Sequence, residues 1–328
     1  MNKLMFLVSV IIPNYNHSKF LTQRIDSVLN QTYQNFEVII LDDCSTDNSK
    51  AIIEGYRSHP QVSHIVYNNQ NSTSTFMQWQ KGFSLAKGNL IWIAESDDYC
   101  ELNFLETLVQ PFIETPDLVI SYCASYTVNE HNEKTGIMKM IRGKEMGKWY
   151  TNNGESEVLK YFLYGQIIPN ASAVLFKKEC LRQVSPTFMQ YKICGDWQFW
   201  LDICCAGSMA YYYTPLNYFR RVEYFVDKPG FNIQHAGKIL FLESLQVGYY
   251  AIKQHKVKMN FLGTMKYTYA YQKSTLHSIF RKQFHFTIAD FKQAYRWLLK
   301  INPLSFIFLP VVCCEAGYLL IIKYIKKL

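Results

Sequence analysis

The chain has 328 residues, of which 49% are hydrophobic and 16% aromatic, so it is not an intrinsically disordered protein. Its nine cysteines include no Cys-x-x-Cys pair, which indicates neither a disulfide framework nor a zinc site and favours a reducing cytosol. The net charge of +8 is uneven: residues 251–328 carry 13 Lys and Arg against 2 Asp and Glu, whereas residues 1–250 carry 21 against 24. This asymmetry predicts an anionic partner for the C-terminal region, either nucleic acid or an anionic membrane surface.

Apolar runs and amphipathic segments alternate through the first hundred residues. The runs predict buried strands at 6–12, 36–41, 62–67 and 90–94. The first run is interpreted as a strand and not as a signal peptide, because it is short and no small-residue cleavage site follows it. Between them we expect helices over 18–30, from a cap at 45–47 through Tyr56, and over 76–86. Short connections between alternating elements predict an α/β fold with a doubly wound, mostly parallel sheet flanked by helices.

Two of these strands end in acidic residues. Asp42 and Asp43 follow the second strand, and Glu95, Asp97 and Asp98 follow the fourth. Because ligands of open α/β sheets bind outside the carboxyl ends of the strands, we expect these acids to share a site. Mg²⁺ or Mn²⁺ carrying a substrate phosphate would neutralise three neighbouring carboxylates. The alternative is a solvated acidic turn that caps a helix beginning near residue 101.

Four motifs occur in order within the first hundred residues. They are Val-Ile-Ile-Pro-Asn-Tyr-Asn at 10–16, Gln-Thr-Tyr-Gln-Asn-Phe-Glu at 31–37, Asp-Asp-Cys-Ser-Thr-Asp at 42–47 and Glu-Ser-Asp-Asp at 95–98. This series resembles glycosyltransferase family 2, closely to about residue 100 and more weakly to about residue 225. The resemblance implies a GT-A fold, a nucleotide-diphosphate sugar donor and a metal-dependent transferase of the EC 2.4 class.

The resemblance also implies a nucleotide site. Pro13 and Tyr15 would line the base pocket, with Tyr15 stacking on the ring. Asp42 and Asp43 would bind the nucleotide, and Asp43 would accept a hydrogen bond from the base. Lys81 is the candidate basic residue facing the diphosphate. The alternatives are a turn aromatic for Tyr15, a helix N-terminal acidic cluster for Asp42 and Asp43, and a solvated helix lysine for Lys81.

By the same resemblance, Asp97 and Asp98 would hold the ribose and the metal–diphosphate. Glu95 stands where many relatives have Asp, so it is a candidate metal ligand with a longer side chain. A further acid, Asp196, lies in Cys194-Gly-Asp-Trp-Gln-Phe-Trp200, where the family carries its general base. Sugar transfer with inversion needs a carboxylate that takes the proton of the acceptor hydroxyl. The alternative is that Asp196 only caps a helix.

The middle of the chain adds further elements without chemistry of its own. We expect helices over 102–113 and 155–164, strands over 118–128, 171–176 and 216–221, and a loop over the site at 129–154. Many relatives have Tyr-Arg-x-His near the end of this region. This chain has Arg220-Arg221-Val222-Glu223, so no metal-ligand histidine is predicted.

Residues 228–300 are rich in aromatic and basic residues, and we expect them to form an accessory layer of helices. Residues 304–322 form a 19-residue apolar run, broken by Pro310, Glu315 and Gly317 and followed by lysines. The run barely reaches the length of a membrane span, and a charged residue is costly there. A surface helix, a span and a buried core helix all remain open.

The resemblance implies a GT-A glycosyltransferase domain over 1–225, and the remaining sequence predicts a helical basic C-terminal region over 226–328 that is a candidate for membrane association. The expected function is an inverting transfer of sugar from a nucleotide-diphosphate donor to a hydroxyl of a glycan or lipid-linked acceptor, in cell-surface polysaccharide or lipid-linked glycan assembly. A non-catalytic nucleotide-sugar-binding protein is the alternative. We expect no nucleic-acid partner, and a cytoplasmic location at the membrane face. No Gly-x-Gly-x-x-Gly follows the first strand, which excludes a dinucleotide dehydrogenase.

Overall fold

A computed structural model describes residues 6–138, 145–162, 166, 168, 170–221, 233–255 and 288–304. The chain divides into two compact units. The first comprises Met1–Gln190 with Phe199–Val222, and the second comprises Tyr191–Gln198 with Glu223–Leu328. The domain boundary predicted at residue 225 lies within 222–232, outside the described residues, so the predicted division stays a prediction.

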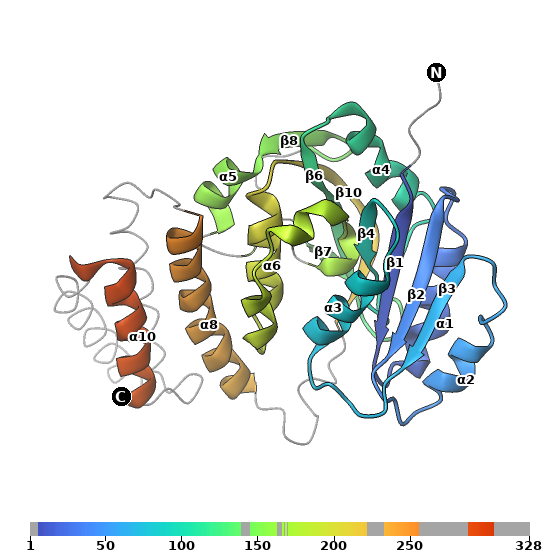
Figure 1. Cartoon of the computed structure of the whole chain (residues 1–328), viewed down its shortest axis with the longest axis horizontal. Helices are drawn as coiled ribbons and strands as arrows, with labels where there is room; N and C mark the ends of the chain where they lie inside the picture. Colours follow the sequence, from blue (N-terminus) through green and yellow to red (C-terminus); the bar gives the residue numbers. More distant parts are fainter. Residues whose placement is uncertain are drawn as a thin grey trace, which may run out of the picture. The chain divides into compact units, whose positions relative to one another are not determined.

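The first unit is built on a mixed sheet of ten strands (Figure 1). The strands are β1 (Val8–Asn14), β2 (Phe36–Asp42), β3 (Val62–Tyr67), β4 (Leu90–Ile93), β5 (Tyr99–Cys100), β6 (Leu118–Val128), β7 (Lys134–Met138), β8 (Trp149–Asn153), β9 (Val174–Lys177) and β10 (Ser208–Arg220). Their order is β3-β2-β1-β4-β9-β6-β10-β5, with β7 beside β6 and β8 beside β10. The pairs among β1 to β4 are parallel, whereas β9 runs antiparallel to β4 and β6.

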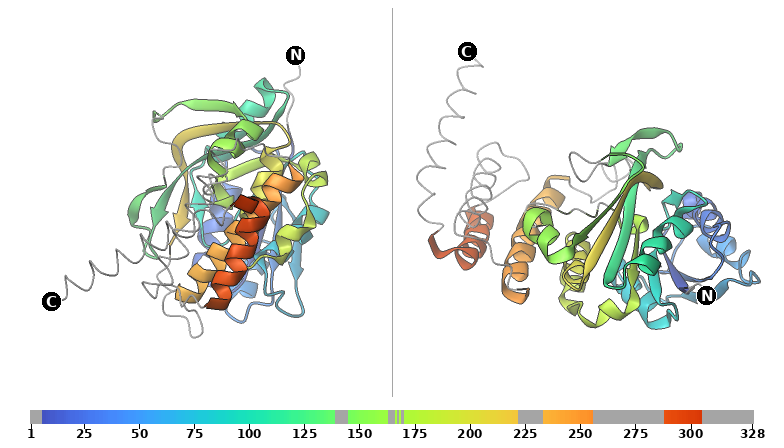
Figure 2. Two further views of the ribbon diagram at one scale, coloured as in Figure 1. Left: turned by 90° about the vertical axis from the view of Figure 1, so that its left-hand side faces the viewer. Right: turned by 90° about the horizontal axis from the view of Figure 1, so that it is seen from above.

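Helices cover both faces of this sheet (Figure 2). The helices of this unit are α1 (Ser18–Leu29), α2 (Ser49–Glu54), α3 (Thr75–Leu85), α4 (Phe104–Glu114), the short α5 (Gly154–Glu157) and, from Phe199 onward, α6 (Gly195–Cys204). Alternate residues of β1 point to opposite faces. Val10 belongs to the same buried apolar cluster as Leu21 and Ile25 of α1, whereas Ile11 contacts α3 so closely that a Cβ on Gly82 would come within 2.5 Å of its Cγ2. Burial on both faces explains why these strands read as unbroken apolar runs.

The structure confirms the first four predicted strands, the three helices between and around them at 18–30, 76–86 and 102–113, and the strand at 118–128, all within two residues. The α2 helix is shorter than predicted. The side chain of its N-cap residue, Asn48, makes no cap, but Oδ1 of Asp47, within the predicted cap, accepts the N–H of Ser49 over 2.9 Å. The loop predicted at 129–154 is wrong, because β7 and β8 lie in it; residues 139–144 between them are outside the described residues. Both are exposed edge strands, so they carry none of the apolar pattern that marks a buried strand.

Three other predicted elements differ in detail. Residues 171–173 form a 3-10 turn instead of the start of a strand, because the Asn170 side chain accepts a hydrogen bond from the Ser172 N–H. The predicted helix at 155–164 is α5 followed by a π-helical turn, Val158–Phe162. The last strand begins at Ser208, eight residues before its predicted start, and passes through a bulge at Pro215.

The second unit contains α8 (Ile233–Gln254) and α10 (Ile288–Ile301). The described part of residues 228–300 is therefore helical, as predicted. These two helices pack through the rings of Tyr249 and Trp297, whose centroids lie 5.4 Å apart, and through an ion pair between Lys238 and Asp290. Almost all of the apolar run at 304–322 lies outside the described residues.

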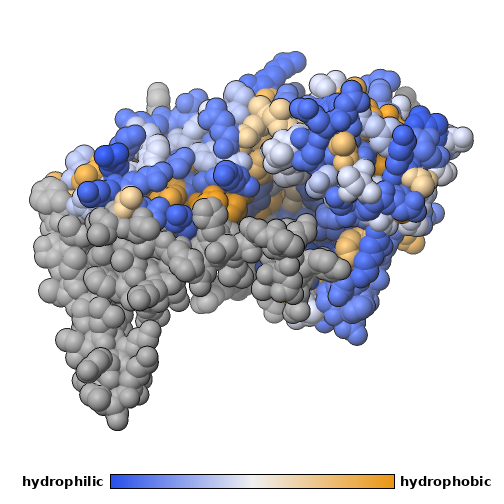
Figure 3. All heavy atoms as spheres, turned by 90° about the horizontal axis from the view of Figure 1, so that it is seen from below, coloured by the Kyte–Doolittle hydropathy of each residue, from blue (hydrophilic) through white to orange (hydrophobic). Residues whose placement is uncertain are grey.

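Within the described part of the chain, we find no helix that combines the length and the apolar character a membrane crossing requires. The face drawn in Figure 3 carries mostly hydrophilic side chains where it is coloured, with small apolar areas between them.

Candidate functional site

The two acidic clusters lie at one edge of the sheet, on either side of β1. Asp43 follows β2 and donates its N–H to the carbonyl of Asn14, at the end of β1, over 2.8 Å. On the other side, the N–H of Ala94 donates to the carbonyl of Ile11, and Glu95 begins the acidic loop there. Since β1 pairs with both β2 and β4 in parallel, the carboxyl ends of all three strands meet at this edge. The predicted shared site therefore has its scaffold.

Asp98 is the most firmly held acid of the loop, which comprises residues 95–98. Asp98 is 1% exposed. Oδ2 accepts a hydrogen bond from the Asn170 side-chain amide over 2.7 Å, and Oδ1 accepts one from the Arg220 backbone N–H over 2.8 Å. Because both oxygens are engaged, Asp98 fixes the loop against β10 and the turn before β9.

Glu95 is held by a buried tryptophan. The Trp79 indole N–H donates to Oε1 over 2.9 Å, and the Glu95 backbone N–H donates to the Ser172 hydroxyl over 3.0 Å. Trp79 is itself 2% exposed and packs against Phe199 and Trp200, with ring centroids 5.6 and 6.1 Å away. The alternative of a solvated acidic turn that caps a helix is therefore wrong: the loop is largely buried, and α4 has no side-chain cap.

Two buried guanidinium groups offset the charge of the loop. Arg24 of α1 is completely buried, donates its Nε–H to the Glu95 carbonyl over 2.8 Å and lies 5.6 Å from the Trp92 ring centroid. Arg220 at the end of β10 donates its Nε–H to the Asp97 carbonyl over 2.7 Å. Both arginines act on the backbone of the loop, so their charge lies beside the carboxylates without occupying carboxylate oxygens.

Burial raises the pKa values of all three acids. The pKa of Glu95 rises to about 8 and that of Asp98 to about 6, in both cases mainly through desolvation and then through the neighbouring Asp97. The pKa of Asp97 is also raised by burial, while Arg24 and Arg220 act in the opposite direction. A bound cation would lower all three pKa values, because it favours the charged form of each carboxylate.

The oxygen donors of this loop fit a divalent ion that arrives with a diphosphate. Among the described residues, no three His, Cys, Asp or Glu side chains converge to hold an ion by themselves. Mg²⁺ is commonly bound through one or two carboxylates together with substrate phosphates, so a complete cage is not required. Asp97 suits this role, because within the described chain its carboxylate accepts a hydrogen bond only from its own N–H. The metal roles of Glu95, Asp97 and Asp98 stay predictions.

Asp43 is the centre of a hydrogen-bond network on the other side of β1. Its carboxylate is 4% exposed. Oδ1 accepts from the side-chain amides of Asn68 over 2.6 Å and Gln78 over 2.8 Å, and Oδ2 accepts from the Ser72 hydroxyl over 2.8 Å. Lys81 donates to the Asn68 carbonyl oxygen, so it is joined to Asp43 through that amide. The structure thus gives Asp43 a scaffolding role in addition to the predicted contact with a base.

The other predicted nucleotide residues lie beside Asp43. Asp42 is 3% exposed and accepts hydrogen bonds from the Asn14 side chain over 2.8 Å and the Ser45 N–H over 3.0 Å. Pro13 is buried in β1, opposite Leu41 of β2. Tyr15 is 45% exposed, so its ring is available for stacking. Of these residues, Tyr15 alone presents a large accessible surface.

Three residues in the loops at this edge have left-handed backbone conformations without being glycine. Asn16 follows β1 with a φ of 56°, Cys44 follows β2 with a φ of 63°, and Thr73 lies after β3 with a φ of 60°. Left-handed conformations are unfavourable for Cys and for a β-branched Thr, and such strain gathers at functional sites. The strained positions support the assignment of this edge as the functional one.

Asp196, the predicted base, lies in the second unit, in the first turn of α6. Its Oδ1 accepts a hydrogen bond from the N–H of the next residue, Trp197, over 2.7 Å. The helix begins at Gly195, as the sequence predicts for a Gly-preceded acid. Its role as a base stays a prediction.

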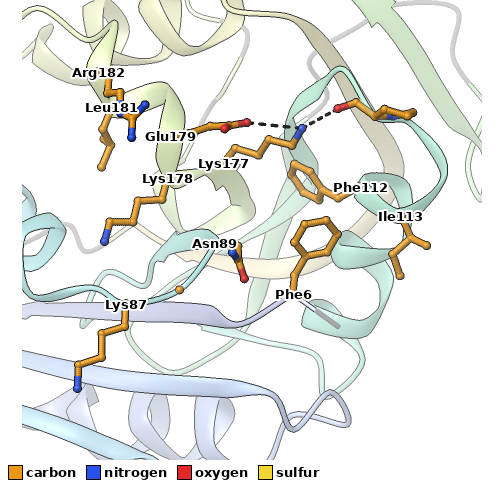
Figure 4. Close-up of a pocket in the computed structure, with 12 residues that line it drawn as sticks. Phe6, Lys87, Asn89, Phe112, Ile113, Lys177, Lys178, Glu179, Leu181 and Arg182 are labelled. Atoms are coloured by element: carbon orange, nitrogen blue, oxygen red, sulfur yellow. Dashed lines mark hydrogen bonds and ion pairs between the residues drawn. The ribbon is translucent and has the colours of Figure 1, made fainter. Parts of the chain in front are cut away.

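A cavity of about 800 Å³ lies at the opposite edge of the sheet (Figure 4). Gly88 and Asn89, which line it, directly precede β4, so it adjoins the amino ends of the parallel strands. Its lining is basic, but the Lys177 ammonium already donates to the Pro116 carbonyl over 2.7 Å. This cavity is therefore separate from the acidic loop and is not the predicted donor site.

The sequence does not predict the site roles of five residues: Arg24, Trp79, Asn170, Ser172 and Arg220. Arg24 had a usable signal, because it occupies the buried stripe of α1 at helical spacing from Leu21 and Val28. A lone arginine on an apolar stripe needs a buried partner. The others approach the loop from distant parts of the chain and carry no local pattern.

Comparisons with known proteins agree with this geometry. Glycosyltransferase GlyG of Streptococcus pneumoniae is 36% identical over 160 residues, which cover 45% of this chain and 52% of GlyG. The chain thus spans about half the length of that relative. Residues 1–349 of Staphylococcus aureus TarS bound to UDP superpose with a TM-score of 0.50 at 15% identity, covering 90% of each chain. The mannosyltransferase PcManGT of Pyrobaculum calidifontis with GDP-Man and Mn²⁺ gives a TM-score of 0.50 at 15% identity, covering 98% of this chain and 80% of that one.

These structural neighbours establish the GT-A fold, as the sequence predicts. The family model described as glycosyl transferase family 2 matches residues 9–181. This match includes β1 from Ser9 onward, both acidic clusters and every predicted site residue except Asp196. Because it covers more than half of the chain, the protein belongs to glycosyltransferase family 2.

Proposed function

We propose that the protein is an inverting glycosyltransferase that moves a sugar from a nucleotide-diphosphate donor to a hydroxyl of a glycan acceptor. The observation that carries this proposal is the buried acidic loop at the carboxyl edge of the sheet, across β1 from Asp43, in a family 2 chain. The UDP and GDP-Man complexes of its structural neighbours support a nucleotide-sugar donor.

The base of the donor would lie beside Tyr15, whose exposed ring offers a stacking surface. Asp43, with Pro13 and Asp42 near it, would fix the edge of the base. Lys81 would be the basic residue that faces the diphosphate; its hydrogen bond to Asn68 joins it to Asp43 on this side of the site. Measuring the affinity for UDP and for GDP by calorimetry would identify the nucleotide.

The diphosphate would be held by Mg²⁺ or Mn²⁺ bound to Asp97 and Asp98. Glu95 would be the third candidate ligand of the ion. The ion supplies charge neutralisation for the departing diphosphate. Chelation with excess EDTA should abolish donor turnover and weaken UDP binding by calorimetry, and added Mn²⁺ or Mg²⁺ should restore both. UDP binding that is the same with and without EDTA would contradict the metal assignment and would leave the fold untouched.

Asp196 would act as the general base. As the acceptor oxygen bonds to the anomeric carbon, the bond to the diphosphate breaks and the hydroxyl proton passes to the Asp196 carboxylate. Asp196→Asn keeps the size and the helix-starting character of the residue. We expect it to bind nucleotide as the wild type does, and to lose about 10²–10⁴-fold in turnover. Nucleotide release from a panel of UDP- and GDP-sugars measures this loss; a variant with wild-type turnover would remove Asp196 from the mechanism.

The acceptor would be a glycan built on a lipid carrier, in cell-surface polysaccharide or lipid-linked glycan assembly at the cytoplasmic membrane face. The positive charge of residues 251–328 supports this proposal, since anionic lipids attract lysine and arginine. A chain that ends at residue 300 should bind vesicles containing anionic lipid less tightly than the full chain, and should keep its affinity for UDP. Equal sedimentation of both chains with such vesicles would contradict a membrane contact through residues 301–328, because the shortened chain keeps 10 of the 13 Lys and Arg of residues 251–328.

A further inference from the structure

The segment just before α6 is held by one carboxylate of α8. The backbone N–H groups of Lys192, Ile193 and Cys194 all donate to the Glu243 side chain, over 2.8, 2.9 and 2.8 Å. Glu243 is 8% exposed, so water competes little for these bonds. Hydrogen bonds to an ionised carboxylate are roughly twice as strong as neutral ones. Three consecutive peptide groups are therefore fixed by a single side chain.

A second contact joins the same segment to α8. The Cys194 thiol lies 3.6 Å from the Leu240 carbonyl oxygen and donates to it, one helical turn before Glu243. Cys194 is 2% exposed, and burial raises the pKa of its thiol, so the proton needed for this contact stays in place. The segment is thus attached to α8 through its backbone and through a side chain.

These contacts end immediately before the candidate base. The Cys194 carbonyl accepts the Gln198 N–H over 3.2 Å, in the first turn of α6, and Asp196 lies between these two residues. The place of Asp196 therefore depends on where Cys194 is held. Reaction rates are sensitive to such placement, since an error of about 1 Å can cost about 100-fold.

We propose that Glu243 is a positioning residue for the candidate base Asp196, so that α8 is part of the catalytic apparatus and not only an accessory layer. This inference rests on the proposed function, in which Asp196 takes the acceptor proton. Glu243 lies well beyond the residues that match the family model, 9–181. The C-terminal region would thus contribute to catalysis through the backbone of residues 192–194, independently of any contact that it makes with a membrane.

The test compares Glu243→Ala and Glu243→Gln with Gln254→Ala, an exposed position at the end of the same helix. Turnover is measured as nucleotide release from the most active donor of the sugar-nucleotide panel, and nucleotide affinity is measured with UDP. We expect Glu243→Ala to lower kcat by about 100-fold, with the Kd for UDP and the KM for the donor within about twofold of wild type. Glu243→Gln keeps one acceptor oxygen and should fall between Glu243→Ala and wild type, and Gln254→Ala should match wild type.

Amide hydrogen exchange checks the contact independently of turnover. In Glu243→Ala, the amides of residues 192–194 should exchange faster, while those of β1 and β2 should be unchanged. Faster exchange across the whole chain, or a loss of UDP binding together with kcat, would mean that Glu243 supports the fold in general and would overturn the inference. So would a kcat of Glu243→Ala within about twofold of wild type.

The double variant Glu243→Ala, Asp196→Asn separates this inference from the function on which it rests. If Glu243 acts through Asp196, its removal should lower turnover little further once the base is gone, because residues that act as a unit are non-additive. An additional loss equal to that in the wild-type background would overturn the positioning role. Wild-type turnover in Asp196→Asn alone would overturn the proposed base, whereas an active Glu243→Ala beside a nearly inactive Asp196→Asn would overturn the positioning role alone.

Discussion

Asp43→Asn tests whether this acid supports the site as well as the nucleotide. The amide oxygen can keep the bonds from Asn68 and Gln78, and the new NH₂ group can donate to the Ser72 hydroxyl in place of accepting from it. What is lost is the negative charge and one of the two contacts that the Ser72 N–H makes with the carboxylate. The substitution therefore leaves the shape of the side chain almost unchanged and removes its negative charge.

The expected cost follows from the bonds that lose their charge. A hydrogen bond to a charged group contributes about 1.5–3 kcal/mol, and a neutral one about 0.5–1.5 kcal/mol. Three such bonds at a 4%-exposed carboxylate give a loss of about 2–3 kcal/mol, since they share one side chain and do not add fully. For a domain of this size each kcal/mol shifts Tm by about 2–4 °C, so we expect Tm to fall by about 4–12 °C.

Thermal unfolding and calorimetry with UDP separate the two roles of Asp43. If Asp43 both supports the loop and contacts the base, the variant should unfold earlier and also bind UDP more weakly, by about 1.5–3 kcal/mol. Ser72→Ala serves as the partner variant: its effect should shrink in the Asp43→Asn background, because the two side chains interact. A Tm within about 1 °C of wild type, below the range derived above, would refute the scaffolding role.

Three further predictions concern the acidic loop and the fold around it. Arg24→Met removes a buried counter-charge of the acidic loop and should cost about 3–5 kcal/mol in urea unfolding, with Arg24→Lys closer to wild type; a cost below about 1 kcal/mol would contradict the charge argument. Asp98→Asn should lower both stability and UDP affinity, because both of its oxygens hold the loop, whereas Asp97→Asn should weaken metal-dependent UDP binding with little change in Tm. Gly154→Ala would place a Cβ 1.9 Å from the Cys204 carbonyl oxygen, so we expect a loss of about 3 kcal/mol in unfolding, and Gly55→Ala, with its nearest atom at 3.2 Å, is the control.

The sequence predicts the parallel half of the sheet well for a physical reason. Strands β1, β2 and β4 are buried on both faces, so their apolar runs are long and end abruptly where the acids begin. The edge strands β7 and β8 were missed because an exposed strand needs no apolar residues. Periodicity therefore finds the elements that carry the site and misses those at its periphery.

The identity of the acids was predictable, and their partners were not. Asp98 is joined to Asn170 and Arg220, which lie 72 and 122 residues further along the chain. Such contacts depend on the order of the strands in the sheet. A single sequence does not specify this order when several strands join the sheet in antiparallel orientation. Arg24 is the exception, since its place on the buried stripe of α1 marks it as a charge in need of a partner.

The way the two arginines hold the acidic loop bears on how the site could work. A guanidinium that paired directly with a carboxylate would neutralise it and occupy its oxygens. Here the Nε–H groups of Arg24 and Arg220 instead donate to the carbonyls of Glu95 and Asp97. The loop is thereby fixed in place and its buried charge is partly offset, while the Asp97 oxygens accept from no other described residue. An anionic loop that is rigid, incompletely neutralised and open at one carboxylate is what a cation arriving with a diphosphate requires, because the ion can then complete the charge balance without displacing a protein contact.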